Sequence, residues 1–342
     1  MKITRLCSRT AQFLSASTTR TSSTTRTRMY MASLAGTPPN LAPSPVQSRG
    51  RSTLAEWPTW LVWGGVYGGF FAVTAFWTQI SPWITIPALA YLICWNGHLM
   101  HEVLHGHPTR SNLINRLLIL PNLIAWMPYE IYRDSHIAHH ETDHLSHPNL
   151  DPESYYIAPE QWARTPGFMQ ALLRANNSLI GRMVIGPIVM VSRFWLSEIR
   201  RFASGDTRYI GAWIILIINN LALAYWLFDI CALPVWQVAL GLYGGLALGT
   251  VRSFTEHRPA DNQDARCAIV ESGPMMQLLF LNNNFHIVHH THPSLPWYEI
   301  PGTYYRNRDY WIAKTQGHWF STYWDVLRRC AFTAKDSPQF PD

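Results

Sequence analysis

The stretch from Trp57 to His101 reads WPTWLVWGGVYGGFFAVTAFWTQISPWITIPALAYLICWNGHLMH, and it contains no Asp, Glu, Lys or Arg. A membrane-spanning helix needs about 20 predominantly apolar residues, so this stretch has room for two of them. The turn between them is expected at residues 78–82. A second such region, residues 209–251, is interrupted by Asp229 alone, and its turn is expected at residues 229–234. The sequence therefore predicts four transmembrane helices arranged as two hairpins.

The positions of the basic residues predict how these hairpins are oriented. Neither hairpin turn contains Lys or Arg, and all 27 basic residues fall within residues 1–55, within residues 102–208 or after residue 251. Because basic residues are enriched on the cytoplasmic side of membranes, these three segments are expected to be cytoplasmic. The predicted fold is an all-α integral membrane protein whose four transmembrane helices carry a cytoplasmic helical cap.

Composition excludes several other classes of protein. The chain is 48% hydrophobic and 14% charged, which excludes disorder of the whole chain. Its net charge of +6 comes from residues 1–55, which hold eight basic residues and no acid, whereas the remainder holds 19 basic and 21 acidic residues. The remainder thus has no basic excess for binding nucleic acid. Five widely separated cysteines predict neither a disulfide framework nor a thiolate zinc site.

Three parts of the chain are expected. Residues 1–55 form a disordered basic tail, which is either similar to an organellar transit peptide or the product of an upstream start codon. Residues 56–320 form the membrane domain, and residues 321–342 form a C-terminal tail. Within the domain, the apolar stretches 113–127 and 179–195 are shorter or carry arginines, so they are expected to lie on the membrane surface. The alternative is that both are further spans.

Fifteen histidines lie beyond residue 97, and most fall in three clusters within residues 98–107, 136–147 and 286–292. In a helix, residues three or four positions apart share one face. Three groups of imidazoles therefore point together: His101 and His105; His136, His139 and His140; and His286, His289 and His290.

Metal binding explains this clustering, because neutral imidazole is a common ligand of transition metals. Eight histidines exceed the four ligands of one tetrahedral zinc and suit two metal ions. The first cluster lies at the end of the second predicted span. The second cluster lies before the third span, and the third cluster lies after the fourth span. All three clusters therefore lie on the cytoplasmic side. His257, just beyond the fourth span, is expected at the same level as His101 and His105.

The three histidine motifs HExxH, HxxHH and HxxHH, in this order around two hydrophobic hairpins, resemble those of the membrane-bound fatty acid desaturase/hydroxylase superfamily. The resemblance covers about residues 57–310. It implies two non-haem irons, dioxygen as co-substrate and a separate electron donor. The ligands that it implies are His101, His105, His136, His139, His140, His257, His286, His289 and His290.

Other polar residues are candidates for roles near these ligands. His98 and His107 are possible additional ligands, His144, His147 and His292 are possible supporting groups, and His318 is expected at the surface. Asp151-Pro152-Glu153 and Asn282-Asn283-Asn284-Phe285 also resemble the superfamily. Acids and amides orient ligating imidazoles by accepting the other ring N–H. The expected residues in this role are Glu102, Asp134, Glu256 and Asn282.

The function that the resemblance implies is O2-dependent desaturation of an acyl chain carried by a lipid, coenzyme A or an acyl carrier protein. No haem-binding or iron–sulfur motif is present in the sequence, so ferredoxin, rubredoxin or a cytochrome b5-type protein is expected to supply electrons. The expected location is the bacterial inner membrane, or an organellar membrane if residues 1–55 are a transit peptide.

Several alternative functions remain open on the sequence. A hydroxylase, a carotenoid ketolase or an alkene-forming fatty acid decarboxylase would share the same motifs, and residues 295–301, LPWYEIP, resemble a segment of bacterial carotenoid ketolases. A membrane zinc protease would use only HExxH and one further ligand, with Glu102 as its general base. A metal transporter would need polar ligands near the bilayer midplane, whereas these histidines lie at the ends of the predicted spans.

Overall fold

The computed structural model describes residues 56–341, and all of them belong to one compact unit. The predicted basic tail, residues 1–55, lies outside the described residues. Within the described part the fold is all-α, with two short strands. The elements are α2 (Trp57–Ala75), η2 (Trp77–Gln79), α3 (Pro82–Leu104), α4 (Asn112–Leu118), α5 (Tyr129–Glu141), α6 (Pro159–Arg164), α7 (Gly167–Asn176), α8 (Leu179–Ala203), α9 (Ile210–Ala224), the π-helical η3 (Tyr225–Ile230), α10 (Val235–Glu256), η4 (Asp264–Arg266), β1 (Ile269–Val270), α11 (Pro274–Leu279), α12 (His286–Thr291), η5 (Trp297–Glu299), α13 (Ile300–Arg306), α14 (Arg308–Lys314), β2 (Trp319–Phe320) and α15 (Tyr323–Cys330).

The two turns that connect the four apolar helical segments lie close to the positions predicted from the sequence. α2 is followed by the short η2, and α3 begins at Pro82, where the preceding Ser81 side chain accepts a hydrogen bond from the Trp83 backbone N–H. Proline suits the first position of a helix because its missing N–H would have no intrahelical partner there. The second turn separates η3 from α10, which begins at Val235 after Pro234.

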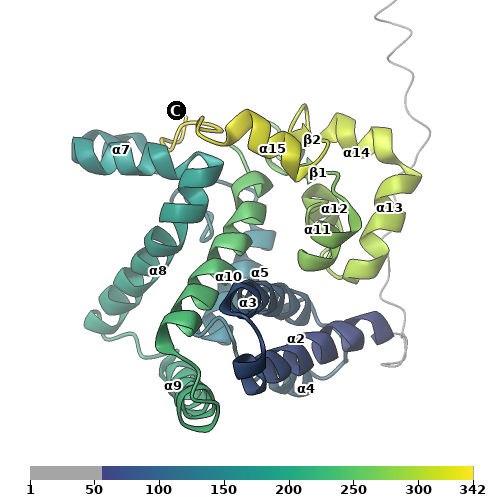
Figure 1. Cartoon of the computed structure of the whole chain (residues 1–342). Coiled ribbons are helices and arrows are strands. Elements are labelled where there is room, and N and C mark those ends of the chain that lie inside the picture. Colours follow the sequence, from purple (N-terminus) through teal and green to yellow (C-terminus); the bar gives the residue numbers. More distant parts are fainter. Residues whose placement is uncertain (1–55, 342) are drawn as a thin grey trace, which may run out of the picture. The chain divides into compact units, whose positions relative to one another are not determined.

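Glycines allow α3 and α10 to pack closely. A Cβ atom added at Gly241 would lie 2.7 Å from Leu89 Cβ, and one added at Gly245 would lie 2.7 Å from Ile93 Cγ2. Helices approach this closely where small residues line the contact. α2 packs on α3 in the same way, through Gly65. Figure 1 shows α10 between α8 and the C-terminal helices α11 to α14.

Two helical segments of the described chain are long and apolar enough to cross a membrane: α8, and residues 210–230, which comprise α9 and η3. α2, α3 and α10 are not among these segments. α8 covers the stretch that the sequence places on the membrane surface. The four-span arrangement and the cytoplasmic cap therefore stay predictions.

The C-terminal elements close over the third histidine cluster. β1 pairs in parallel with β2, which joins residues 269–270 to residues 319–320. The segment predicted as a C-terminal tail contains α15, whose Tyr323 and Val326 are buried against Val270 and Phe280 in an apolar cluster. Near the end of the chain, the Phe340 N–H donates a hydrogen bond to the Ile157 carbonyl oxygen.

Candidate metal centre

Three helices supply seven of the predicted ligands, and the other two, His105 and His257, directly follow α3 and α10. α3 ends at Leu104, and the helical spacing places His101 and His105 on one face at that end. His257 directly follows the last residue of α10 in extended backbone. The second and third histidine motifs lie on α5 and on the six-residue helix α12. Residues far apart in the sequence thus converge at the ends of long helices.

The nine predicted ligands form two groups. Within each group every residue offers one ligand atom, and these atoms all lie within 4.8 Å of one another. We refer to them as the five-histidine group and the four-histidine group. The five-histidine group comprises His101, His105, His136, His140 and His289, and the four-histidine group comprises His139, His257, His286 and His290.

Ring nitrogens face one another inside the four-histidine group. The Nε2 atom of His257 lies 3.1 Å from that of His139 and 2.9 Å from that of His286. The Nδ1 atoms of these three rings lie near the oxygens of Asp151, Asn283 and the Arg266 carbonyl. A neutral imidazole has one N–H, so donation from Nδ1 leaves each Nε2 as a bare lone pair. Three lone pairs directed at one point fit a metal cation.

The five-histidine group has the same character. The Nε2 atom of His140 lies 3.0 Å from the Nε2 atoms of both His136 and His289. The Nε2 atom of His105 is buried without a hydrogen-bond partner. Buried polar atoms are normally satisfied, so an unpartnered nitrogen among other ring nitrogens also fits a metal ligand. The two groups together suggest a di-metal site.

Burial keeps five of these imidazoles in the form that binds metal, whereas His139 differs: burial acts to lower its pKa, but the Asp151 and Glu153 carboxylates outweigh burial and raise it. Burial disfavours the protonated ring, and the neighbouring imidazoles of the cluster act in the same direction. The unprotonated ring retains the lone pair that a metal ion needs. The pKa is lowered well below its usual value for His105, His257, His286, His289 and His290.

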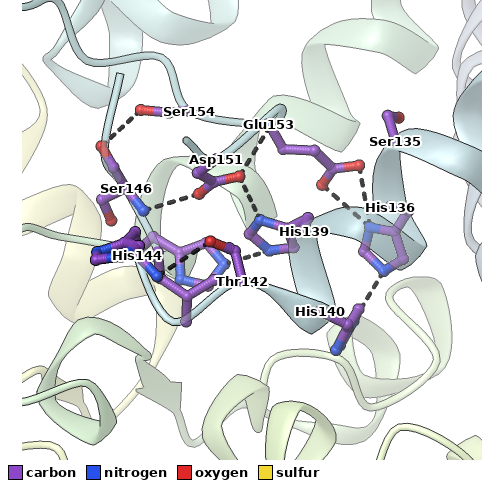
Figure 2. A network of polar contacts seen from close by, with 12 residues as sticks. Ser135, His136, His139, His140, Thr142, His144, Ser146, Asp151, Glu153 and Ser154 are labelled. Carbon is purple, nitrogen blue, oxygen red and sulfur yellow. Dashed lines mark hydrogen bonds and ion pairs between the residues drawn. The ribbon is translucent and has the colours of Figure 1, made fainter. Parts of the chain in front are cut away.

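Two acids after α5 orient the second motif. His139 Nδ1 lies 2.7 Å from an Asp151 carboxylate oxygen, and His136 Nδ1 lies 3.0 Å from a Glu153 carboxylate oxygen. Asp151 also accepts hydrogen bonds from the Ser146 and Glu153 backbone N–H groups, which fixes its position (Figure 2). Neither acid is among the four expected in this role, although the sequence motif Asp151-Pro152-Glu153 indicates them.

Asn283 links the two histidine groups. Its Oδ1 atom lies 3.0 Å from His286 Nδ1, and its Nδ2 atom lies 3.2 Å from His101 Nε2. The sequence signal for this residue is its position three residues before His286. Asn282, the amide expected in this role, donates instead to the Trp297 carbonyl oxygen.

The three other expected supporting residues have different surroundings. Glu256 lies 3.4 Å from His286 Nδ1 and also forms an ion pair with Arg252. Glu102 accepts a hydrogen bond from the Trp297 backbone N–H. Asp134 binds Arg133 and accepts a hydrogen bond from the Tyr209 hydroxyl. Glu256 alone among these three carboxylates lies beside a predicted ligand.

His98 and His107 lie outside both histidine groups. His98 is buried, and its ring makes a T-shaped contact with that of Phe280. His107 Nδ1 lies 3.1 Å from Glu56. Burial acts to lower the pKa of His107, but the Glu102 and Glu56 carboxylates outweigh it and raise the pKa to about 9. A protonated ring has no lone pair for a metal, so this geometry favours a role for His107 in an ion pair.

The remaining histidines do not join either group. His144 is exposed, and His147 and His292 are half-buried. His318, which the sequence places at the surface, is 3% exposed, because it lies in the turn before β2 where the C-terminal elements pack together. Sequence reasoning was wrong on this residue because the segment around it carries no apolar periodicity.

Comparison with known proteins gives one match by family. Residues 77–324 match the model of a protein family described as fatty acid desaturase. This range covers more than half of the chain and includes all nine predicted ligands. A comparison with curated proteins gives no match.

Proposed function

The chain belongs to the fatty acid desaturase family, and from that premise we propose that it is an oxidoreductase that uses dioxygen to introduce a double bond into an acyl chain. The observation that carries the proposal is the pair of histidine groups, with four and five ligand atoms. Imidazole suits iron, zinc and copper. Zinc has no redox chemistry, and the three histidine motifs contain no cysteine, the softer ligand that favours copper(I). Two irons are therefore the metals that we propose.

The protein's own contribution is to hold the ligands in one arrangement. Asp151 and Glu153 accept the Nδ1 protons of His139 and His136, which directs the Nε2 lone pairs toward the metal positions. Asn283 does the same for His286. When bound, the irons would supply the oxidising chemistry together with dioxygen. Electrons would come from a separate ferredoxin, rubredoxin or cytochrome b5-type protein.

An acyl chain has a place to bind beside the ligands. A cavity of about 520 Å³ reaches His136, His139, His257 and His286. Part of its wall is apolar and would exclude water from the reacting carbons. The apolar side chains of this wall include Met127, Ile131, Leu173, Val189, Met190 and Phe194.

The geometry does not favour a zinc protease. That alternative needs Glu102 free to activate a water molecule, but its Oε1 atom accepts a hydrogen bond from the Trp297 backbone N–H. It would also leave most of the nine clustered histidines without a role. A hydroxylase, a ketolase or an alkene-forming decarboxylase would use the same centre. Each would differ from a desaturase only in its product.

We further propose that the protein is a multi-pass membrane protein with its active site on the cytoplasmic face. The distribution of basic residues supports this orientation. The two long apolar segments, 179–203 and 210–230, support insertion into a membrane.

Lipid and hydrocarbon profiling of a host that expresses the protein tests the proposed reaction. New unsaturated acyl chains are expected with the unmodified protein and not with His290→Ala. Hydroxylated chains, ketones or terminal alkenes would assign one of the related reactions instead. No change in lipids from an iron-loaded protein with its electron donor present would contradict the proposal.

A further inference from the structure

The cavity beside the metal centre has a second chemical feature besides its apolar wall. It lies between α5, α8 and α10, and its volume of about 520 Å³ falls within the usual range of small-molecule sites, about 300–1,000 Å³. Two arginines of α8, Arg182 and Arg193, line this cavity.

Neither arginine forms an ion pair with a carboxylate of residues 56–341. Each of the three acids that line the cavity already has another partner. Glu153 pairs with His136, Glu198 pairs with Arg201, and Glu256 pairs with Arg252. Arg182 and Arg193 therefore bring two positive charges without an ion-pair partner to the same cavity, and of the two Arg182 is buried and Arg193 is exposed.

Arg182 is almost completely enclosed. It is 8% exposed, and its Nε atom is buried without a hydrogen-bond partner. Its guanidinium donates a long hydrogen bond of 3.3 Å from Nη2 to the Asn177 side-chain oxygen. Enclosing a charge without an anionic partner costs free energy, and an arginine within an apolar membrane helix usually marks a functional site. An anion in the cavity would supply the missing partner.

Tyr155 connects both arginines to the metal centre. The Arg182 guanidinium lies 4.3 Å from the centre of the Tyr155 ring, and Arg193 Nη1 donates to the Tyr155 carbonyl oxygen. The Tyr155 hydroxyl donates to the carbonyl oxygen of His257. One tyrosine ring thus separates the arginine pair from the backbone of a predicted ligand.

Gly186 gives the Arg182 side chain room to lie along α8. A Cβ atom at this position would stand 3.0 Å from Arg182 Cδ and 3.4 Å from the Asn176 side-chain oxygen. Both Gly186 and Asn176 line the cavity. A larger residue at position 186 would therefore displace the Arg182 side chain.

We propose that Arg182 and Arg193 bind the carboxylate of a free fatty acid, whose chain continues along the apolar wall toward the histidines. The inference rests on the proposed function and names its substrate as an unesterified acid. Guanidinium groups match carboxylates because two parallel N–H groups can donate to the two oxygens. The apolar residues Val189, Met190 and Phe194 follow on the same helix and suit the hydrocarbon chain.

Calorimetric binding of three probes to the full-length, metal-loaded protein in detergent tests this proposal. The probes are octanoate, methyl octanoate and octanoyl-coenzyme A. We expect octanoate to bind at least tenfold more tightly than its uncharged ester. Equal affinity for octanoate and the ester would overturn the proposal, and tighter binding of the coenzyme A thioester would assign the arginines to a phosphate-bearing carrier instead.

Variants distinguish a specific role of these two arginines in carboxylate binding from a general effect of positive charge. Arg182→Gln/Arg193→Gln is expected to remove the preference for octanoate over the ester, and Arg182→Lys to retain part of it. Arg200→Gln, an exposed arginine on the same helix, is the matched control and should bind all probes like the unmodified protein. Metal content is measured in each sample, so a variant that has lost the metal centre is distinguished from one that has lost carboxylate binding alone. Absence of bound metal from the unmodified protein would instead contradict the proposed function. Retained preference in a metal-loaded double variant would refute the assignment.

Discussion

The Nε2 atoms of His257 and His286 lie 2.9 Å apart, although 29 residues separate them in the chain. His257 directly follows the long helix α10, whereas His286 begins the short helix α12. Between them the chain passes through η4, β1 and α11, which return it to the same point. This contact places His257 in the four-histidine group, the second set of predicted ligands.

We expect His257→Ala to lose about one metal ion per chain, because the four-histidine group would keep three ligands. The control is His144→Ala, which removes an exposed histidine that belongs to neither group. Elemental analysis of both purified variants checks the prediction. Full metal content in His257→Ala would place the second metal elsewhere.

Asp151→Asn is expected to weaken metal binding about 10- to 100-fold, because supporting acids fix the orientation and basicity of a ligating imidazole. The Asp151 carboxylate lies 2.7 Å from His139 Nδ1. Competition with a coloured chelator measures the change. Asp134→Asn serves as the comparison, since Asp134 contacts Arg133 and Tyr209. Equal chelator resistance of the two variants would show that Asp151 does not support the centre.

Gly245→Ala should destabilise the fold by about 1–3 kcal/mol, the usual cost of overpacking a closely packed contact. The new Cβ atom would meet Ile93 Cγ2 at 2.7 Å and the Ala90 carbonyl oxygen at 3.0 Å. Gly249→Ala in the same helix meets nothing within 4 Å, so it should be neutral or slightly stabilising. Thermal unfolding in detergent compares them. A Gly245→Ala protein as stable as Gly249→Ala would disprove close packing of α3 on α10.

Much of the site could be predicted from the sequence because its information is local. Spacings of three and four residues place His101 with His105 and His286 with His290 whatever the rest of the chain does. Absence of charge from residues 57–101 likewise predicts two long helices, and the structure has α2 and α3 there. The grouping of the nine ligands into five and four could not be predicted, since it depends on how α3, α5 and α12 pack.

The contacts around the ligands were harder to predict for the same reason. Asp151 reaches His139 through a loop whose course follows from tertiary structure, whereas Asp134, on the same helix as His139, contacts Tyr209 instead. The arginines of α8 carried no functional signal in the sequence beyond their unusual position in an apolar stretch. The role proposed for them depends on the cavity that α8 forms with α5 and α10.

Metal analysis of the purified, full-length protein tests the central claim most directly. Two histidine groups and a redox function predict about two irons per chain, and His290→Ala should reduce that number. A single zinc per chain, with no iron bound after reconstitution under reducing conditions, would contradict the account.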